Sequence, residues 1–97
     1  MFEIEKFVIQ GKTFQGMKST LPDVAPLLLI KGDKGFVMCG FLNMDAAERL
    51  GAAAAMVSGV KTFEDVLNAE VKAATTKAKE LGVQVGGKVR DEIAKLG

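Results

Sequence analysis

Few side chains in this sequence could carry out chemistry, and Cys39 is the first to consider because it is the one cysteine in a chain without histidine. A reactive thiol needs a neighbouring base, cation or helix N-terminus to lower its pKa. Without histidine, only Lys31, Lys34 or Lys61 could supply that help. Because free cysteine is among the most frequently buried residue types, packing is the favoured role for Cys39, and thiol catalysis is the alternative.

The missing histidine also excludes Cys-His and Ser-His nucleophile pairs, and with a single cysteine it excludes an ordinary zinc site. No pair of carboxylates is spaced in a way that requires general acid and general base roles. The sequence therefore predicts no metal and no cofactor, and it favours a protein that is not an enzyme.

A second candidate site is the segment from Gly59 to Thr62, which we expect to join a strand to the N-terminus of a helix. Free N–H groups and the helix dipole attract anions at such places, and a lysine strengthens the attraction. Gly59, Lys61 and Thr62 are thus the candidate ligand-binding residues for an anion or another small molecule, although the segment lacks the Walker A pattern. Ordinary capping by Thr62 with a solvated Lys61 is the favoured interpretation, and Gly86-Gly87-Lys88 is a weaker case of the same kind.

These candidates are positioned by the stretch Pro26 to Asn43, which reads as one β-hairpin with Pro26 beginning its first strand. Gly32 to Gly35 supplies the turn, and we expect Gly35 to adopt a positive φ. A half-buried strand alternates apolar and polar residues, but neither arm of this hairpin does. Since the few short helices can cover only one face of the sheet, we expect another copy of the chain to cover the other.

The spacing of apolar residues, together with helix-capping residues and glycines, predicts the remaining elements. Strands are expected over Phe2–Gln10, Thr13–Thr20 and Ala52–Val57, and helices over Met44–Leu50 with Asn43 as N-cap, from the Thr62 cap to about Asn68, and over Lys88–Leu96. Two interpretations compete for residues 69–81. Either they form one helix, or a short strand over Glu70–Ala74 precedes a helix that Thr75 caps and Gly82 ends, and we favour the second.

Length predicts a single domain over residues 1–97. The expected strands and helices give it a mixed or antiparallel sheet with a central hairpin and short helices on one face. The 48% hydrophobic and 26% charged residues are typical of a globular protein.

Charge and hydropathy limit the expected partners. A net charge of +1 gives no general attraction to nucleic acid or anionic lipid. The longest uncharged run, Leu50–Val60, is about half the roughly 20 residues that span a membrane, and the start MFEIEKF lacks the features of a secretory signal. We expect a cytoplasmic homo-oligomer that binds neither nucleic acid nor membrane.

Three stretches, LLLIKGDKGFVMCGFLN, AAMVSGVKTFEDVL and KELGVQVG, resemble the YunC-like family, a domain of unknown function in bacteria and archaea. The resemblance runs from about Pro26 to the C-terminus. Cys39-Gly40 and Gly59 to Asp65 are its most particular features, whereas Gly87 to Arg90 departs from the family pattern. The resemblance implies an α+β fold in which the strands of residues 1–25 build a sheet-mediated homotetramer and residues 26–97 form the α/β body. It also favours the strand-then-helix interpretation of Glu70 to Leu81. The family brings no established activity, so the resemblance assigns no functional residue.

Overall fold

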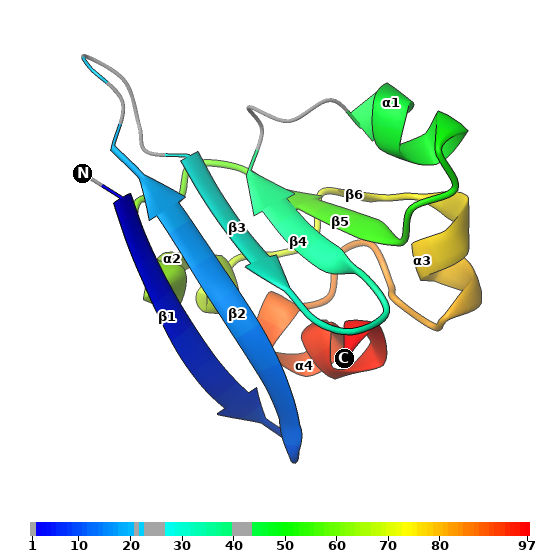
Figure 1. The fold of residues 1–97 in the computed structure, drawn as a ribbon. Helices are drawn as coiled ribbons and strands as arrows, with labels where there is room; N and C mark the ends of the chain where they lie inside the picture. The colour runs from blue at the N-terminus through cyan, green and yellow to red at the C-terminus, as the bar shows by residue number, and fades with distance from the viewer. Residues whose placement is uncertain (1, 21, 23–26, 40–43) are drawn as a thin grey trace.

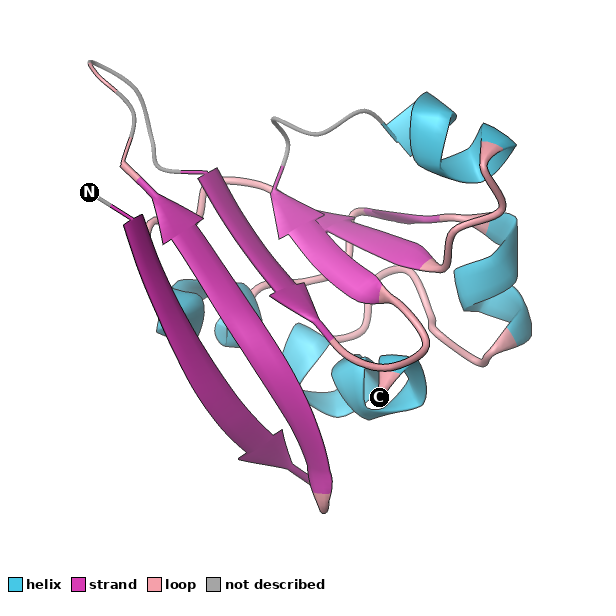
Figure 2. Ribbon diagram, in the orientation of Figure 1, coloured by secondary structure: helices cyan, strands magenta, loops and turns pink. Residues whose placement is uncertain are grey.

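The computed structural model describes residues 2–20, 22, 27–39 and 44–97, which fold around one six-stranded sheet (Figures 1 and 2). The strands are β1 (Phe2–Ile9), β2 (Lys12–Ser19), β3 (Leu27–Lys31), β4 (Phe36–Cys39), β5 (Ala54–Val57) and β6 (Ala73–Ala74). The helices are α1 (Met44–Arg49), α2 (Phe63–Asn68), α3 (Thr76–Glu80), α4 (Val89–Glu92) and the 3₁₀ helix η1 (Ile93–Leu96). The strands lie side by side in chain order, and all neighbours are antiparallel except β4 and β5. This arrangement confirms the predicted α+β class.

One face of the sheet, called here the inner face, packs against α2, α3, α4 and η1 and holds the main core. Its buried strand residues are Phe14, Leu28, Ile30, Val37, Cys39, Ala55 and Val57. The helices contribute Val66, Leu67, Ala78, Val89, Ile93 and Leu96 to the same cluster. Figure 1 shows α2 and α4 behind the sheet. The apolar stripe of the predicted last helix, Val89, Ile93 and Leu96, is therefore confirmed as core, although the helix tightens from α to 3₁₀ at Ile93.

The opposite face, called here the outer face, is partly covered by α1. Ala47 of α1 packs in a small cluster with Met38 of β4 and Ala54 of β5. Helix α1 connects the two parallel strands, which need a crossover connection. The expectation that the helices lie on one face thus holds for four of the five described helices, while the fifth covers only the β4–β5 end of the outer face.

The turn between β3 and β4 differs from its predicted conformation. Gly35 does not have a positive φ, so the expected left-handed glycine is wrong. The turn is held instead by Gly32 N–H, which donates to the Gly35 carbonyl at 2.8 Å, and by the N–H groups of Lys34 and Gly35, which donate to the Leu96 carbonyl at 2.9 and 3.0 Å. A side chain at Gly35 would overlap the Ala53 carbonyl, so this glycine allows a close approach of two backbones.

The strand-then-helix interpretation of residues 69–81 is confirmed. Strand β6 covers Ala73–Ala74, Thr75 caps α3, and Gly82 follows the helix with a φ of +102°. The predicted strand start at Pro26 and the predicted N-cap Asn43 lie outside the described residues. No helix among the described residues is both long and apolar enough to span a bilayer.

We predict that Thr75 stabilises the fold through its hydroxyl, which is the buried polar group among the described residues of the core. Its Oγ1 donates to the Ala52 carbonyl at 2.7 Å and accepts from the N–H groups of Ala54 at 3.0 Å and Ala78 at 3.3 Å. Replacement with valine keeps the shape but leaves these groups unpaired, so Thr75→Val should lower the free energy of unfolding by about 1 to 3 kcal/mol in urea. Thr75→Ser should retain most of the stability, and equal losses in both variants would contradict this role.

A pH-dependent contribution is expected from Glu92, whose side chain is 12% exposed. Its Oε1 accepts from Lys95 Nζ at 2.8 Å and from Gln84 N–H at 3.0 Å. The Lys95 hydrogen bond, aided by the Gln84 bond and opposed by burial, holds the pKa of Glu92 below its ordinary value of 4.5. A lowered folded pKa stabilises the protein above the unfolded pKa, and this stability is lost as pH falls through the folded value.

Glu92→Gln should therefore lower the free energy of unfolding by about 1 kcal/mol at pH 7. The difference from the wild type should shrink as pH falls below 4.5. Urea titrations of both proteins across this pH range measure the effect. A difference that does not depend on pH would show that the charge of Glu92 is not its cause.

Candidate functional site

The two sequence candidates, Cys39 and the Gly59 to Thr62 segment, lie at the same edge of the sheet. Strands β4 and β5 are parallel, and Cys39, the last residue of β4, is paired with Val57, the last residue of β5. The chain continues from Val57 through Gly59 to the start of α2. The carboxyl ends of parallel strands are frequent ligand sites in α/β proteins. A ligand or a reaction at this edge would need hydrogen-bond donors or a thiol that the fold leaves free.

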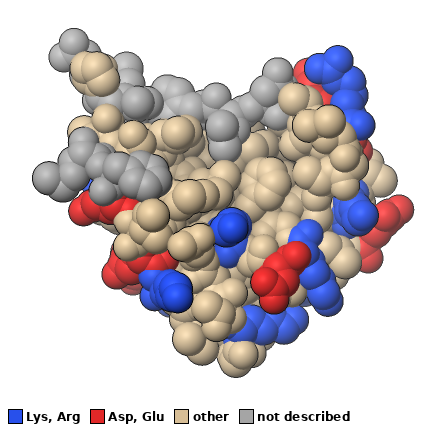
Figure 3. Space-filling model, in the orientation of Figure 1, with Lys and Arg blue, Asp and Glu red and all other residues tan. Residues whose placement is uncertain are grey.

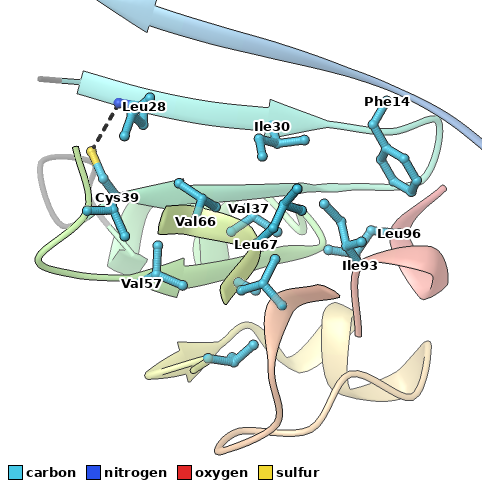
Figure 4. Close-up of a cluster of buried hydrophobic side chains, with 14 of the residues drawn as sticks. Phe14, Leu28, Ile30, Val37, Cys39, Val57, Val66, Leu67, Ile93 and Leu96 are labelled. Carbon is cyan, nitrogen blue, oxygen red and sulfur yellow. Dashed lines mark hydrogen bonds between the residues drawn. The ribbon is translucent and has the colours of Figure 1, made fainter. Parts of the chain in front are cut away.

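The Cys39 thiol is directed into the inner core and is 4% exposed (Figure 4). Its sulfur accepts a hydrogen bond from Leu28 N–H at 3.5 Å. Lys31 is paired with Phe36 at the other end of the hairpin and points to the outer face. In the described part of the chain, no hydrogen bond or ion pair joins a lysine ammonium to this sulfur. The geometry of Cys39 is that of a packed core residue.

The Gly59 to Thr62 segment forms a capped helix start. Thr62 is the N-cap of α2, and its Oγ1 accepts from Asp65 N–H at 3.0 Å. In return, Asp65 Oδ2 accepts from the N–H groups of Thr62 at 3.2 Å and Lys61 at 3.1 Å. This is a complete capping box. The N–H groups that would hold an anion here already donate to the carboxylate of Asp65.

Gly59 has a φ of +71°, and the space next to it is open. Lys61 is exposed, and within the described residues its ammonium forms no ion pair. The weaker candidate segment, Gly86-Gly87-Lys88, is tied to the fold: Gly86 N–H donates to the Val71 carbonyl at 2.8 Å, and Val71 N–H donates to the Gly87 carbonyl at 2.9 Å.

A pocket of about 420 Å³ adjoins Thr62 on the inner-face side of β1 and β2. It is lined by Glu3, Ile4, Glu5, Lys18, Thr62 and Phe63. Lys18 lies 3.7 Å from Glu3, so two carboxylates face one ammonium that is already paired. This excess of negative charge disfavours an anion beside Thr62.

Gly16 leaves room for two aromatic rings next to this pocket. The rings of Phe7 and Phe63 pack edge to face with centroids 5.3 Å apart. A Cβ on Gly16 would lie 2.7 Å from both rings, so the aromatic pair needs a glycine beneath it. Strand β2 is paired on both sides at this position, which means that Gly16 marks a close approach and not a bulge.

A further group of residues was missed by sequence reasoning. Lys6, Gln15 and Lys31 come from three strands and line a second pocket of about 240 Å³ on the outer face. Their alignment depends on the pairing of β1, β2 and β3. The sequence feature that could have indicated this group is that each of the three residues is a polar residue in an otherwise largely apolar strand. Within the described residues, no cluster of three Cys, Asp or Glu side chains is arranged to hold a metal ion.

Fold and site together define a small α+β domain with a mixed sheet, a two-sided apolar hairpin and no assembled catalytic group among its described residues. The chain belongs to the family described as a domain of unknown function, DUF1805, whose model matches residues 38–96. This match, together with the YunC relative described next, confirms the predicted resemblance to the YunC-like family.

Two relatives extend the similarity to almost the whole chain. The chain is 27% identical over 100 residues to the uncharacterized protein YunC of Bacillus subtilis (strain 168), covering 99% of this chain and 98% of that protein. It also matches the crystal structure of a protein of unknown function, TA1206, from Thermoplasma acidophilum. That match has a TM-score of 0.95 and 45% identity and covers 100% of this chain and 94% of the other.

We predict that Cys39 is inert in the folded protein because its thiol is buried and packed. Iodoacetamide should leave the native protein unmodified and alkylate it in denaturant, as measured by mass spectrometry. Cys39→Ala should lower the free energy of unfolding by about 1 to 2 kcal/mol, since it removes a buried sulfur. Rapid alkylation under native conditions would contradict the packing role and revive thiol chemistry.

Proposed function

We propose that this chain is a non-catalytic, self-associating domain in which a second copy covers a row of apolar side chains on the outer face of the sheet. The observation that carries the proposal is a row of apolar side chains across this face. One strand after another contributes Ile4, Met17, Leu29, Met38 and Met56, each directly opposite the next in the pairing register. Adjacent strands lie about 4.8 Å apart, so the row extends for about 19 Å.

Helix α1 covers only one end of this row. Met38 is 2% exposed because Ala47 packs near it, whereas Met17, Leu29 and Met56 are half-buried and Ile4 is 56% exposed. Figure 3 shows the outer face, since it shares the view of Figure 1 in which α2 and α4 lie behind the sheet. Uncharged groups, drawn in tan, make up much of this face, and a few charged groups lie among them. Removing an apolar surface of this kind from water lowers the free energy, so the surface favours contact with another protein.

A second copy of the chain fits this surface better than an unrelated partner because it carries the same apolar row. In a two-fold interface the same surface is used by both subunits, so flat rows of methionine and aliphatic side chains can pack on each other. The family resemblance favours a tetramer as the final state. We also propose a cytoplasmic location, which suits a chain whose single cysteine has no intrachain disulfide partner.

The alternative functions have less support. Thiol-dependent catalysis would need an accessible Cys39, which is 4% exposed. Anion binding at Gly59, Lys61 and Thr62 would need N–H groups that Asp65 already accepts from. The buried thiol therefore gives no support to an enzyme, and the capped helix start gives none to a ligand at this edge.

Light scattering over a dilution series tests self-association. The wild type should show a mass that is a multiple of the 10.3 kDa chain. Ile4→Glu places a charge in the apolar row and should shift the population towards the monomer, because a charge in a contact surface has to be desolvated. Val85→Glu is the matched control, since Val85 is 51% exposed and Ile4 56%.

Circular dichroism should show that both variants remain folded. A wild type that stays monomeric at every concentration would contradict the proposal. A Val85→Glu variant that dissociates as readily as Ile4→Glu would show that the outer face is not the contact surface.

A further inference from the structure

A polar row crosses the outer face next to the apolar one. Lys6 of β1 lies directly opposite Gln15 of β2, and Gln15 lies directly opposite Lys31 of β3. All three side chains leave the same face, because Lys6 alternates with Phe7 and Gln15 alternates with Phe14, both of which pack in the inner core. The Cα atoms of the two lysines are about 10 Å apart, which is two strand spacings.

Neither lysine forms an ion pair with an acid in the described part of the chain. The ion pairs found there join Lys18 to Glu3, Arg90 to Glu64 and Lys95 to Glu92. Glu3 and Glu5, the acids of β1, alternate with Lys6 and lie beside the pocket on the opposite side of the sheet. Two like charges on one sheet face that form no ion pair repel each other. They are therefore poised to bind an anion.

The surface between the lysines is hollowed. The pocket of about 240 Å³ has Lys6 and Lys31 on its wall together with Thr13, Gln15, Gly32 and Asp33. Two ammonium groups, the Gln15 amide and the Thr13 hydroxyl can all donate hydrogen bonds into it. None of these four side chains forms a hydrogen bond within the described residues, so the donors are free. One acid, Asp33, lies on the wall.

We propose that this pocket binds a phosphate group, either as free phosphate or as the terminal group of a phosphomonoester. A phosphate dianion balances the two ammonium charges, and its oxygens accept from several donors at once. Lysine binds phosphate as a point charge, so the donors need no forked geometry. All the lining residues belong to one chain, and the site does not depend on the proposed self-association.

Asp33 gives the proposal a distinctive signature. Its carboxylate repels an anion in the pocket, so its removal should strengthen binding while removal of either lysine weakens it. A general attraction of phosphate to surface lysines would not depend on this one carboxylate. A gain of phosphate affinity on removal of Asp33, together with a loss on removal of either lysine, would therefore distinguish a defined site from general attraction.

The experiment is a titration of the full chain with inorganic phosphate at about pH 8 and constant ionic strength, followed by the NMR signals of the Gln15 side-chain amide. Glycerol phosphate is titrated in a second arm and acetate, a monoanion, in a third. We expect saturation with a dissociation constant of about 1 to 10 mM for phosphate and no saturation for acetate. Tighter binding of glycerol phosphate than of phosphate would identify a phosphomonoester as the ligand, and the reverse order free phosphate.

Four variants complete the test. Lys6→Gln and Lys31→Gln should each weaken phosphate binding about three- to tenfold, and Asp33→Asn should strengthen it about two- to threefold. Lys72→Gln, an exposed lysine outside the pocket, should leave it unchanged. No saturable shift, equal binding of acetate, or equal effects of Lys31→Gln and Lys72→Gln would overturn the proposal. Light scattering at both ends of each titration separates binding from any change in association.

Discussion

The central hairpin has apolar side chains on both faces, and the rest of the described chain is arranged around the need to remove both from water. Leu28, Ile30 and Val37 lie on the inner face, where α2, α4 and η1 complete the main core. Leu29 and Met38 lie on the outer face, where α1 packs over one end. Because burial of apolar area is the dominant favourable term in folding, this asymmetry explains both the helix layer and the apolar row that remains on β1 to β3.

Local chemistry in the sequence predicted most of the elements. Thr62 and Asp65 have the spacing of a capping box, and the structure contains that box with both of its bonds. Thr75 and Gly82 bracket α3 as expected. The conformation of Gly35 was predicted wrongly, since turn chemistry indicates which residues can bend a chain but not that a distant carbonyl, that of Leu96, will hold this turn from outside.

The pockets were also harder to predict, because they too depend on contacts between distant parts of the chain. Cys39 and Gly59 were chosen as single residues, and the parallel pairing of β4 and β5 brings them to one sheet edge. Yet the donors at that edge are used by the fold, because Asp65 accepts from the helix start and Leu28 donates to the sulfur. Free donors occur instead where cross-strand register aligns Lys6, Gln15 and Lys31. The polar residue in each strand is visible in the sequence, but its alignment with the other two depends on the register of two strand pairs, which the pattern of one strand alone does not give.

The bond between the Leu96 carbonyl and the β3–β4 turn also bears on the order in which the chain folds. Strands β1 to β4 each pair with the next strand in sequence, so this part of the sheet can assemble through short connections with little loss of chain entropy. The contact of Lys34 and Gly35 with Leu96 is different, because it closes a loop that includes most of the domain. A nascent chain can thus pair its strands during synthesis, but the amides of this turn stay open to solvent until the last helix has left the ribosome.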